Sequence, residues 1–84
     1  MKITFKLFAT LTDYLPAHAR TSNVVQLDVP ADASVSQIIE PFALPPKLVH
    51  LVLVNGVFVA PAQRLTRTLR EGDTLAIWPP IAGG

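Results

Sequence analysis

Residues 24–42 read VVQLDVPADASVSQIIEPF, and the spacing of the apolar residues changes within this stretch. The opening segment, VVQLDV at 24–29, alternates apolar and polar side chains as far as Pro30. Alternation with a period of two is typical of a half-buried strand. Beyond Pro30 the apolar residues follow the spacing of one helical face: they are Val35, Ile38, Ile39 and Phe42. The stretch therefore predicts a strand followed by a helix.

Two features bound the predicted helix. Ser34 precedes the helical spacing and Gln37 stands three residues later, which is the pattern of a capping box. Pro41 ends or kinks the helix, because proline has no N–H and its ring clashes with the preceding turn. We therefore expect a helix over residues 34–42 whose apolar face packs against a sheet.

The chain before this stretch predicts a partner strand. KITFKLF at 2–8 alternates strictly, so that Ile3, Phe5 and Leu7 share one face. We expect this strand to pair with 24–29 as a hairpin. Residues 9–15 predict a short helix that ends before Pro16, and residues 17–23 predict a polar loop.

The second half of the chain predicts three more strands. LVHLVLV at 48–54 is apolar almost throughout, which indicates a central strand buried on both faces. Asn55-Gly56 is a hairpin signal, because both residues tolerate positive φ, and residues 57–59 would form the returning strand. After a polar connection at 62–70, Glu71-Gly72-Asp73 predicts a turn and residues 74–78 the last strand.

The order of elements is β-β-α-β-β-β, with a possible helical turn after the first strand. This order predicts an α+β fold, the β-grasp or ubiquitin-like roll, in which one main helix lies across a mixed sheet of four to five strands. The folded domain would span residues 1–78. Residues 79–84 would form a flexible C-terminal tail ending in Gly-Gly.

Composition excludes several function classes. The chain has 84 residues and half of them are hydrophobic, which fits one small domain with a dense core. The net charge is +1 and the basic residues form no continuous run, so we expect no nucleic-acid partner. The absence of cysteine excludes disulfides, thiolate nucleophiles and iron–sulfur clusters. The alternating start is not a signal peptide, and no apolar stretch spans a bilayer, so a cytoplasmic protein without a membrane partner is expected.

The residues within the predicted domain form no recognisable active site. His18 lies in a polar loop, and His50 has no carboxylate close in sequence to orient it. The six acidic residues are dispersed, and no glycine-rich loop is present that could hold a phosphate. We therefore expect no bound metal and no bound cofactor.

The six residues after Trp78 differ from the rest of the chain. Pro79-Pro80 favours an extended exit, and Ile81 and Ala82 follow it. Gly83 and Gly84 have no side chains, so they can pass through a narrow tunnel into the active site of another protein. Small residues are also common at ordinary chain ends. A carboxylate on Gly84 becomes a good acyl donor once it is joined to AMP, and a sulfur nucleophile could then convert it to a thiocarboxylate.

Four segments resemble the MoaD/ThiS family of ubiquitin-like sulfur carriers. Residues 6–15, KLFATLTDYL, are similar to the family's first strand and following helix, and PADASVSQII at 30–39 to its capped helix start. VNG at 54–56 resembles the family's central hairpin. EGDTLAIWPPIAGG at 71–84 resembles the family's closing segment and is the most specific of the four.

The resemblance implies a role for each residue of the closing segment. Gly84 would be adenylated by a ubiquitin-activator-like enzyme that uses ATP, then thiocarboxylated, and its sulfur would pass to an acceptor. Pro79, Pro80, Ile81, Ala82 and Gly83 would thread the tail, and Trp78 would take the place of a family aromatic that packs against partners. The ending is most like that of the small subunit of molybdopterin synthase, whose tail enters the large subunit. Such a protein is not catalytic alone.

Three alternatives share these features. The carrier could serve thiamine thiazole or another sulfur metabolite, or the chain could be a protein modifier that joins Gly84 to lysines. It could also be a β-grasp interaction module whose Gly-Gly ending is accidental. Under any of them we expect exposed apolar residues near the end of the last strand, with Trp78 and Phe58 as the partner-binding candidates.

Overall fold

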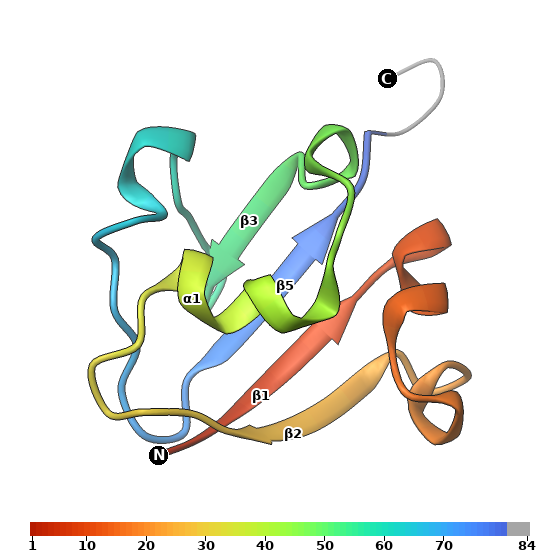
Figure 1. Ribbon diagram of the computed structural model, residues 1–84, viewed down its shortest axis with the longest axis horizontal. Coiled ribbons are helices and arrows are strands. Elements are labelled where there is room, and N and C mark those ends of the chain that lie inside the picture. Colours follow the sequence, from red (N-terminus) through yellow and green to blue (C-terminus); the bar gives the residue numbers. More distant parts are fainter. Residues whose placement is uncertain (81–84) are drawn as a thin grey trace.

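The computed structural model describes residues 1–80, which form one mixed sheet covered on one face by helical segments (Figure 1). The sheet order is β2-β1-β5-β3-β4. The strands are β1 (Lys2–Leu7), β2 (Val24–Asp28), β3 (Leu51–Val54), β4 (Val57–Phe58) and β5 (Thr74–Trp78). The single α-helix of the described part, α1, spans Val35–Ile39. This arrangement is the predicted β-grasp fold.

The strand pairing is that of a mixed sheet. Strands β1 and β2 form the predicted antiparallel hairpin, with Lys2 opposite Asp28 and Lys6 opposite Val24. Strand β5 lies parallel to β1, with Leu7 opposite Ile77, and antiparallel to β3 on its other side. The last strand is therefore the middle strand of the sheet, and its C-terminal end lies between β1 and β3.

The helix begins as the sequence predicts. The Ser34 hydroxyl accepts a hydrogen bond from the Gln37 N–H at 3.2 Å, and the Gln37 side-chain oxygen accepts one from the Ser34 N–H at 2.9 Å. These two bonds form the capping box. The α-helix ends at Ile39, and a 3₁₀ turn at Glu40–Phe42 that contains Pro41 completes the predicted span of 34–42.

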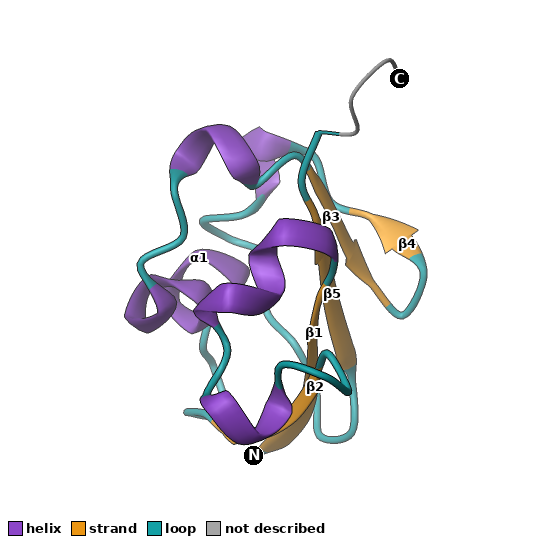
Figure 2. Cartoon of the chain, turned by 90° about the vertical axis from the view of Figure 1, so that its right-hand side faces the viewer, coloured by secondary structure: helices purple, strands orange, loops and turns teal. Residues whose placement is uncertain are grey.

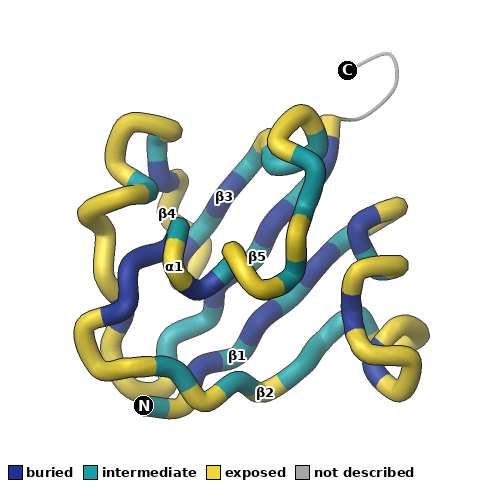
Figure 3. The backbone as a smooth tube through the Cα atoms, viewed as in Figure 1, coloured by how far each residue is buried: buried dark blue, intermediate teal, exposed yellow. Residues whose placement is uncertain are grey.

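The core lies between the sheet and the helical segments, and Figure 3 shows its buried residues along β1, β5 and β3. Val35 and Ile38 of the predicted helix face are buried, and Ile39 and Phe42 are half-buried against the same core. The rings of Phe5 and Phe42 have centroids 4.6 Å apart. The buried apolar residues are Ile3, Phe5, Leu7, Leu11, Leu15, Ala19, Ala33, Val35, Ile38, Val52, Val54, Val59, Leu69, Leu75 and Ile77.

The prediction for residues 48–54 was wrong in extent and in burial. A 3₁₀ turn occupies Pro46–Leu48, and β3 begins only at Leu51. Within β3, Val52 and Val54 are buried whereas Leu51 and Leu53 are half-buried. The reason is that helical segments cover only one face of the sheet, so the other face of each strand meets solvent. The strand does lie inside the sheet, between β5 and β4.

The connections follow the predicted turn chemistry. Asn55 and Gly56 adopt φ values of 51° and 81°, which confirms the two-residue hairpin, and Gly72 has φ of 84° in the turn before β5. The short helix predicted at 9–15 is a 3₁₀ helix over Ala9–Tyr14. The predicted loop at 17–23 contains a further 3₁₀ turn, Ala17–Ala19, whose last residue is buried.

Candidate functional site

The candidate site is the end of β5, from which the predicted tail continues. Trp78 is the last residue of the strand and is partly buried. Pro79 is buried and Pro80 is exposed, so the packed part of the chain extends one residue beyond the strand. The other predicted tail residues, Ile81, Ala82, Gly83 and Gly84, lie outside the described residues.

An aromatic stack holds Trp78 in place. The rings of Phe8 and Trp78 lie 3.9 Å apart between centroids and are tilted by only 3°. Phe8 directly follows β1, and its N–H donates to the Ile77 carbonyl at 3.2 Å, which keeps the two strand ends together. Sequence reasoning missed Phe8. The signal was present, because the alternation of β1 places Phe8 on the same face as Lys2, Thr4 and Lys6, where it is the only apolar residue.

A main-chain hydrogen bond fixes the other side of the strand end. The N–H of His50 donates to the Trp78 carbonyl at 3.2 Å. Proline at 79 and 80 offers no N–H with which the sheet could be continued. Among the described residues, this is the last hydrogen bond of β5 before the tail.

The face of the sheet that carries Trp78 is apolar around the strand end. In register, Leu51 lies opposite Trp78, and Leu53 lies opposite both Ala76 and Phe58. Phe58 is 52% exposed, and the other members are partly buried. Figure 2 shows the helical segments gathered on the opposite side of the sheet, so none of them covers this face. We call it the outer apolar face; its members are Phe8, Leu51, Leu53, Phe58, Ala76 and Trp78.

Both partner-binding candidates from the sequence lie on this face. Phe58 occupies the edge strand β4, and Trp78 ends the middle strand, with Leu51 and Leu53 of β3 between them. Lys6 lies opposite Ala76 from β1 and places one positive charge at the border of the face. The sequence prediction missed Leu51 and Leu53 because it placed both sides of that strand in the core.

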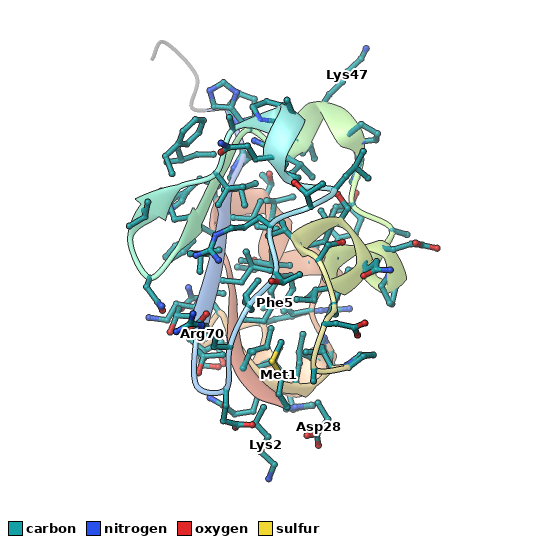
Figure 4. The ribbon with its side chains drawn as sticks, turned by 90° about the vertical axis from the view of Figure 1, so that its left-hand side faces the viewer. Met1, Lys2, Phe5, Asp28, Lys47 and Arg70 are labelled. Carbon is teal, nitrogen blue, oxygen red and sulfur yellow. The ribbon has the colours of Figure 1, made fainter. Side chains whose placement is uncertain are left out.

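The other candidate residues are dispersed over the domain. His18 and His50 are both exposed, and residues 1–80 bring together no three His, Asp or Glu side chains that could bind a metal. A hollow of about 350 Å³ borders Asp28, Pro30, Gln37 and Ile38. Figure 4 places Asp28 beside Met1 and Lys2, at the end of the domain opposite Lys47. None of the helices in the described part is both long and apolar enough to cross a membrane.

The carboxylate of Asp73 accepts two hydrogen bonds, but this residue belongs to the turn that precedes β5. The pKa of Asp73 is lowered because the Arg70 N–H donates to one carboxylate oxygen at 2.8 Å and the Asn55 side-chain amide donates to the other at 2.9 Å. The Asn55 oxygen accepts in turn from the Thr74 N–H at 2.9 Å. This network joins the hairpin turn to the start of β5 and fixes the strand whose far end carries the site.

The fold and its sheet order define a small ubiquitin-like protein. The sequence matches the Mut7-C ubiquitin family over residues 1–82, and the chain belongs to this family. The match leaves out Gly83 and Gly84. No curated protein matches the chain significantly in sequence.

Solved structures share the fold over nearly the whole chain. Small archaeal modifier protein 1 of Haloferax volcanii is 28% identical, with a TM-score of 0.67 and complete coverage of both chains. A putative molybdopterin converting factor subunit 1 of Pyrococcus furiosus is 19% identical, has a TM-score of 0.68, and is aligned over 96% of this chain and 99% of its own. A chain in a complex of subunits 1 and 2 of the molybdopterin-converting factor of Helicobacter pylori is 15% identical, with a TM-score of 0.63 and complete coverage of both chains.

Proposed function

We propose that this protein is a sulfur carrier whose working group is the carboxylate of Gly84 as its terminal residue. The observation that carries the proposal is the strand end. Trp78 is held between Phe8 and His50 beside an uncovered apolar face, and the chain then continues as Pro-Pro-Ile-Ala-Gly-Gly. Trp78 fixes the point where the tail begins, the two prolines restrict its first residues, and the two glycines carry no side chains. These features suit a protein that presents its terminus to the active site of a partner.

The proposed chemistry needs an activating enzyme, because a free carboxylate is a poor acyl donor. The Gly84 carboxylate attacks the α-phosphorus of ATP, pyrophosphate leaves, and an acyl-adenylate forms. A persulfide of the partner then attacks the acyl carbon, and AMP leaves. A partner thiol cleaves the resulting acyl disulfide, which forms a disulfide on the partner and releases the thiocarboxylate. Dividing one difficult acyl transfer into two easier steps is the usual benefit of a covalent intermediate.

The outer apolar face would bind the activating enzyme during this reaction. The face adjoins Trp78, so a partner seated on it lies next to the first residues of the tail. Phe58 and Trp78 are the aromatic residues best placed to contribute to binding, since aromatic side chains bury about 150–250 Å² each and few apolar groups of this size remain exposed on a small domain. Binding of the partner would then depend on the outer apolar face, and the reaction would depend on the tail. Mutations in the two regions can therefore affect binding and reaction separately.

Molybdopterin synthesis is the leading pathway within this proposal. The fold is shared with molybdopterin converting factor subunit 1 of Pyrococcus furiosus and with a chain of the two-subunit complex of Helicobacter pylori. By analogy, a large synthase subunit would accept the sulfur from the thiocarboxylate. Thiamine thiazole or another sulfur metabolite is the next acceptor class, because the tail chemistry is the same.

Protein modification is the second candidate function. It is favoured by the 28% identity to small archaeal modifier protein 1 of Haloferax volcanii over the full length of both chains. A modifier activates the same carboxylate but transfers it to a lysine amine, so an isopeptide bond forms and no sulfur is delivered.

Mass spectrometry of the protein purified from cells separates the two functions. A sulfur carrier is expected as a monomer in which one sulfur replaces one oxygen at Gly84, and alkylation of that thiocarboxylate shifts its mass. A modifier is expected as conjugates whose tryptic peptides carry residues 71–84, EGDTLAIWPPIAGG, on a lysine of the target, because Arg70 is the last trypsin site of the chain. A native protein that shows neither form, even when its cognate activating enzyme is overproduced, would contradict both functions.

A further inference from the structure

Arg64 connects two separate segments of the chain near the candidate site, residues 49–50 and Val59. Its side chain is partly buried, and it donates from all three guanidinium nitrogens to main-chain carbonyls. Nε reaches the Val59 carbonyl at 3.4 Å, one terminal nitrogen reaches Val49 at 3.2 Å, and the other reaches His50 at 3.2 Å. Partial burial lowers the pKa of Arg64 from its ordinary value, but the guanidinium stays charged.

The main chain of Arg64 is anchored as well. Its carbonyl accepts a hydrogen bond from the Ser36 N–H at 2.9 Å, in the first turn of α1. The guanidinium therefore extends from a main-chain position that is hydrogen-bonded to α1. Arginine suits this task because its planar fork presents several donors in a rigid arrangement.

The segment that Arg64 holds is the one that contacts the strand end. Residues 49 and 50 precede β3 and lie outside the strand, so the pairing of β3 alone does not fix them. His50 nevertheless donates its N–H to the Trp78 carbonyl. The hydrogen bonds thus connect α1 to Arg64, Arg64 to His50, and His50 to the last residue of β5.

The orientation of the Trp78 carbonyl, together with the packing of Pro79, sets the direction in which the chain leaves β5. The carbonyl lies in the plane of the peptide bond that joins Trp78 to Pro79, so fixing the carbonyl fixes that plane. Proline then locks φ near −65° at two successive positions. Two prolines in an extended conformation carry the direction onward by about 3.1 Å per residue. Small rotations of this one carbonyl therefore change the direction in which the tail leaves the domain.

We propose that Arg64 is a positioning residue that sets the direction in which Pro79 and Pro80 leave β5, for the partner that activates Gly84. The inference rests on the proposed function, and it adds that domain binding and tail presentation depend on different residues. Arg64 lies in the connection between β4 and β5 and is not a member of the outer apolar face. Its loss should therefore change the reaction of the tail and leave the affinity of the domain for its partner unchanged.

The test compares Arg64→Met and Arg64→Lys with Arg67→Met. Methionine retains an apolar stem without donors. Lysine retains the charge, but its donors all lie on one nitrogen, whereas arginine reaches the three carbonyls from three separate nitrogens. Arg67 is an exposed arginine of the same connection, and within residues 1–80 its guanidinium bonds only its neighbour, the Thr68 carbonyl, at 2.6 Å. Thermal melts identify any variant that is not folded. If Arg64→Met does not fold, the more conservative Arg64→Lys is used for both readouts.

The first readout is amide hydrogen exchange, which needs no partner. Loss of the Arg64 bonds should speed exchange at the His50 amide by about tenfold, the effect of losing roughly one hydrogen bond. The Val52 and Val54 amides, which lie within β3, should exchange as in the parent. Arg67→Met should leave all three unchanged. Unchanged protection at His50 in both Arg64 variants would overturn the proposal.

The second readout is ATP–pyrophosphate exchange with the cognate activating enzyme, together with the Kd of the complex. Both Arg64 variants should lower kcat at least about fivefold, because a displaced reacting group loses rate steeply, while Kd stays within about twofold. A parent-like kcat, or a loss that lies entirely in Kd, would show that Arg64 only stabilises the loop. If the parent itself is not adenylated, the proposed function fails, and the exchange rate at His50 still decides whether Arg64 holds the strand end.

Discussion

Replacing Phe58 by alanine tests whether the outer apolar face binds the activating enzyme. Phe58 is 52% exposed in the free domain, which leaves on the order of 100 Å² of its surface for a partner to cover. At about 25 cal/mol per Å², covering that surface contributes roughly 2.5 kcal/mol. Alanine retains a small part of this contact, so we expect Phe58→Ala to cost about 2 kcal/mol of binding free energy. That cost corresponds to a roughly thirtyfold increase in Kd.

The same substitution should change the domain itself very little. Phe58 lies on the two-residue edge strand β4 opposite Leu53, and such a cross-strand pair contributes about 0.2–1 kcal/mol. Titration calorimetry with the activating enzyme measures Kd, and ATP–pyrophosphate exchange separates KM from kcat. We expect KM to rise with Kd while kcat at saturation stays close to that of the parent.

Leu65 provides the matched control. It is apolar and 75% exposed, but it lies in the connection between β4 and β5 and is not part of the outer apolar face. Leu65→Ala should leave both Kd and KM unchanged. If Phe58→Ala binds as tightly as the parent, or if Leu65→Ala weakens binding equally, the partner does not dock on the proposed face.

Two further predictions concern the scaffold that holds the site. Ser34→Ala removes the capping-box acceptor of α1 and should destabilise the domain by about 1 kcal/mol, which lowers Tm by roughly 4–8 °C; an unchanged melt would show that the cap contributes nothing. Asp73→Asn should destabilise the domain at neutral pH but not in strong acid. The folded-state pKa of Asp73 is lowered, so its contribution is present above the unfolded value near 3.9 and disappears as pH falls through the folded value. Urea unfolding at pH 7 and at about pH 2 measures the difference in unfolding free energy between the parent and Asp73→Asn at each pH. A difference that persists at the lower pH would show that the ionised carboxylate of Asp73 is not its cause.

The sequence predicted the fold wherever the pattern was local. Alternation identified β1 and β2, the turn signal at 71–73 placed β5 after it, and the Ser34–Gln37 capping box and the Asn55-Gly56 turn appear in the structure as expected. These features depend on neighbouring residues alone, so one segment is enough to recognise each of them. The β-grasp arrangement followed from their order.

The errors arose where distant segments decide the outcome. Leu51 and Leu53 are half-buried because no helical segment covers their face of the sheet, and a run of apolar letters cannot show which face is covered. Phe8 and Trp78 are separated by most of the chain, and only the parallel pairing of β1 with β5 brings them together. Arg64 offered no signal at all, since a single arginine in a polar connection usually lies in solvent.

Deleting Gly84 and measuring adenylation tests the central claim most directly. The deletion moves the terminal carboxylate back by up to about 3.3 Å along the chain, and even ~1 Å of misplacement can cost on the order of a hundredfold in rate. Gly84 has no side chain and stands six residues after Trp78, so we expect stability to change by no more than about 0.5 kcal/mol. Gly84→Ala should be milder than the deletion, because its carboxylate stays within reach although a methyl group must fit the tunnel.

The measurement pairs thermal melts with ATP–pyrophosphate exchange in the presence of the cognate activating enzyme. We predict that the deletion variant melts like the parent and supports no exchange, whereas the parent does. A deletion variant that melts like the parent and still supports full exchange would show that the Gly84 carboxylate is not the working group, and the sulfur-carrier account would fail with it.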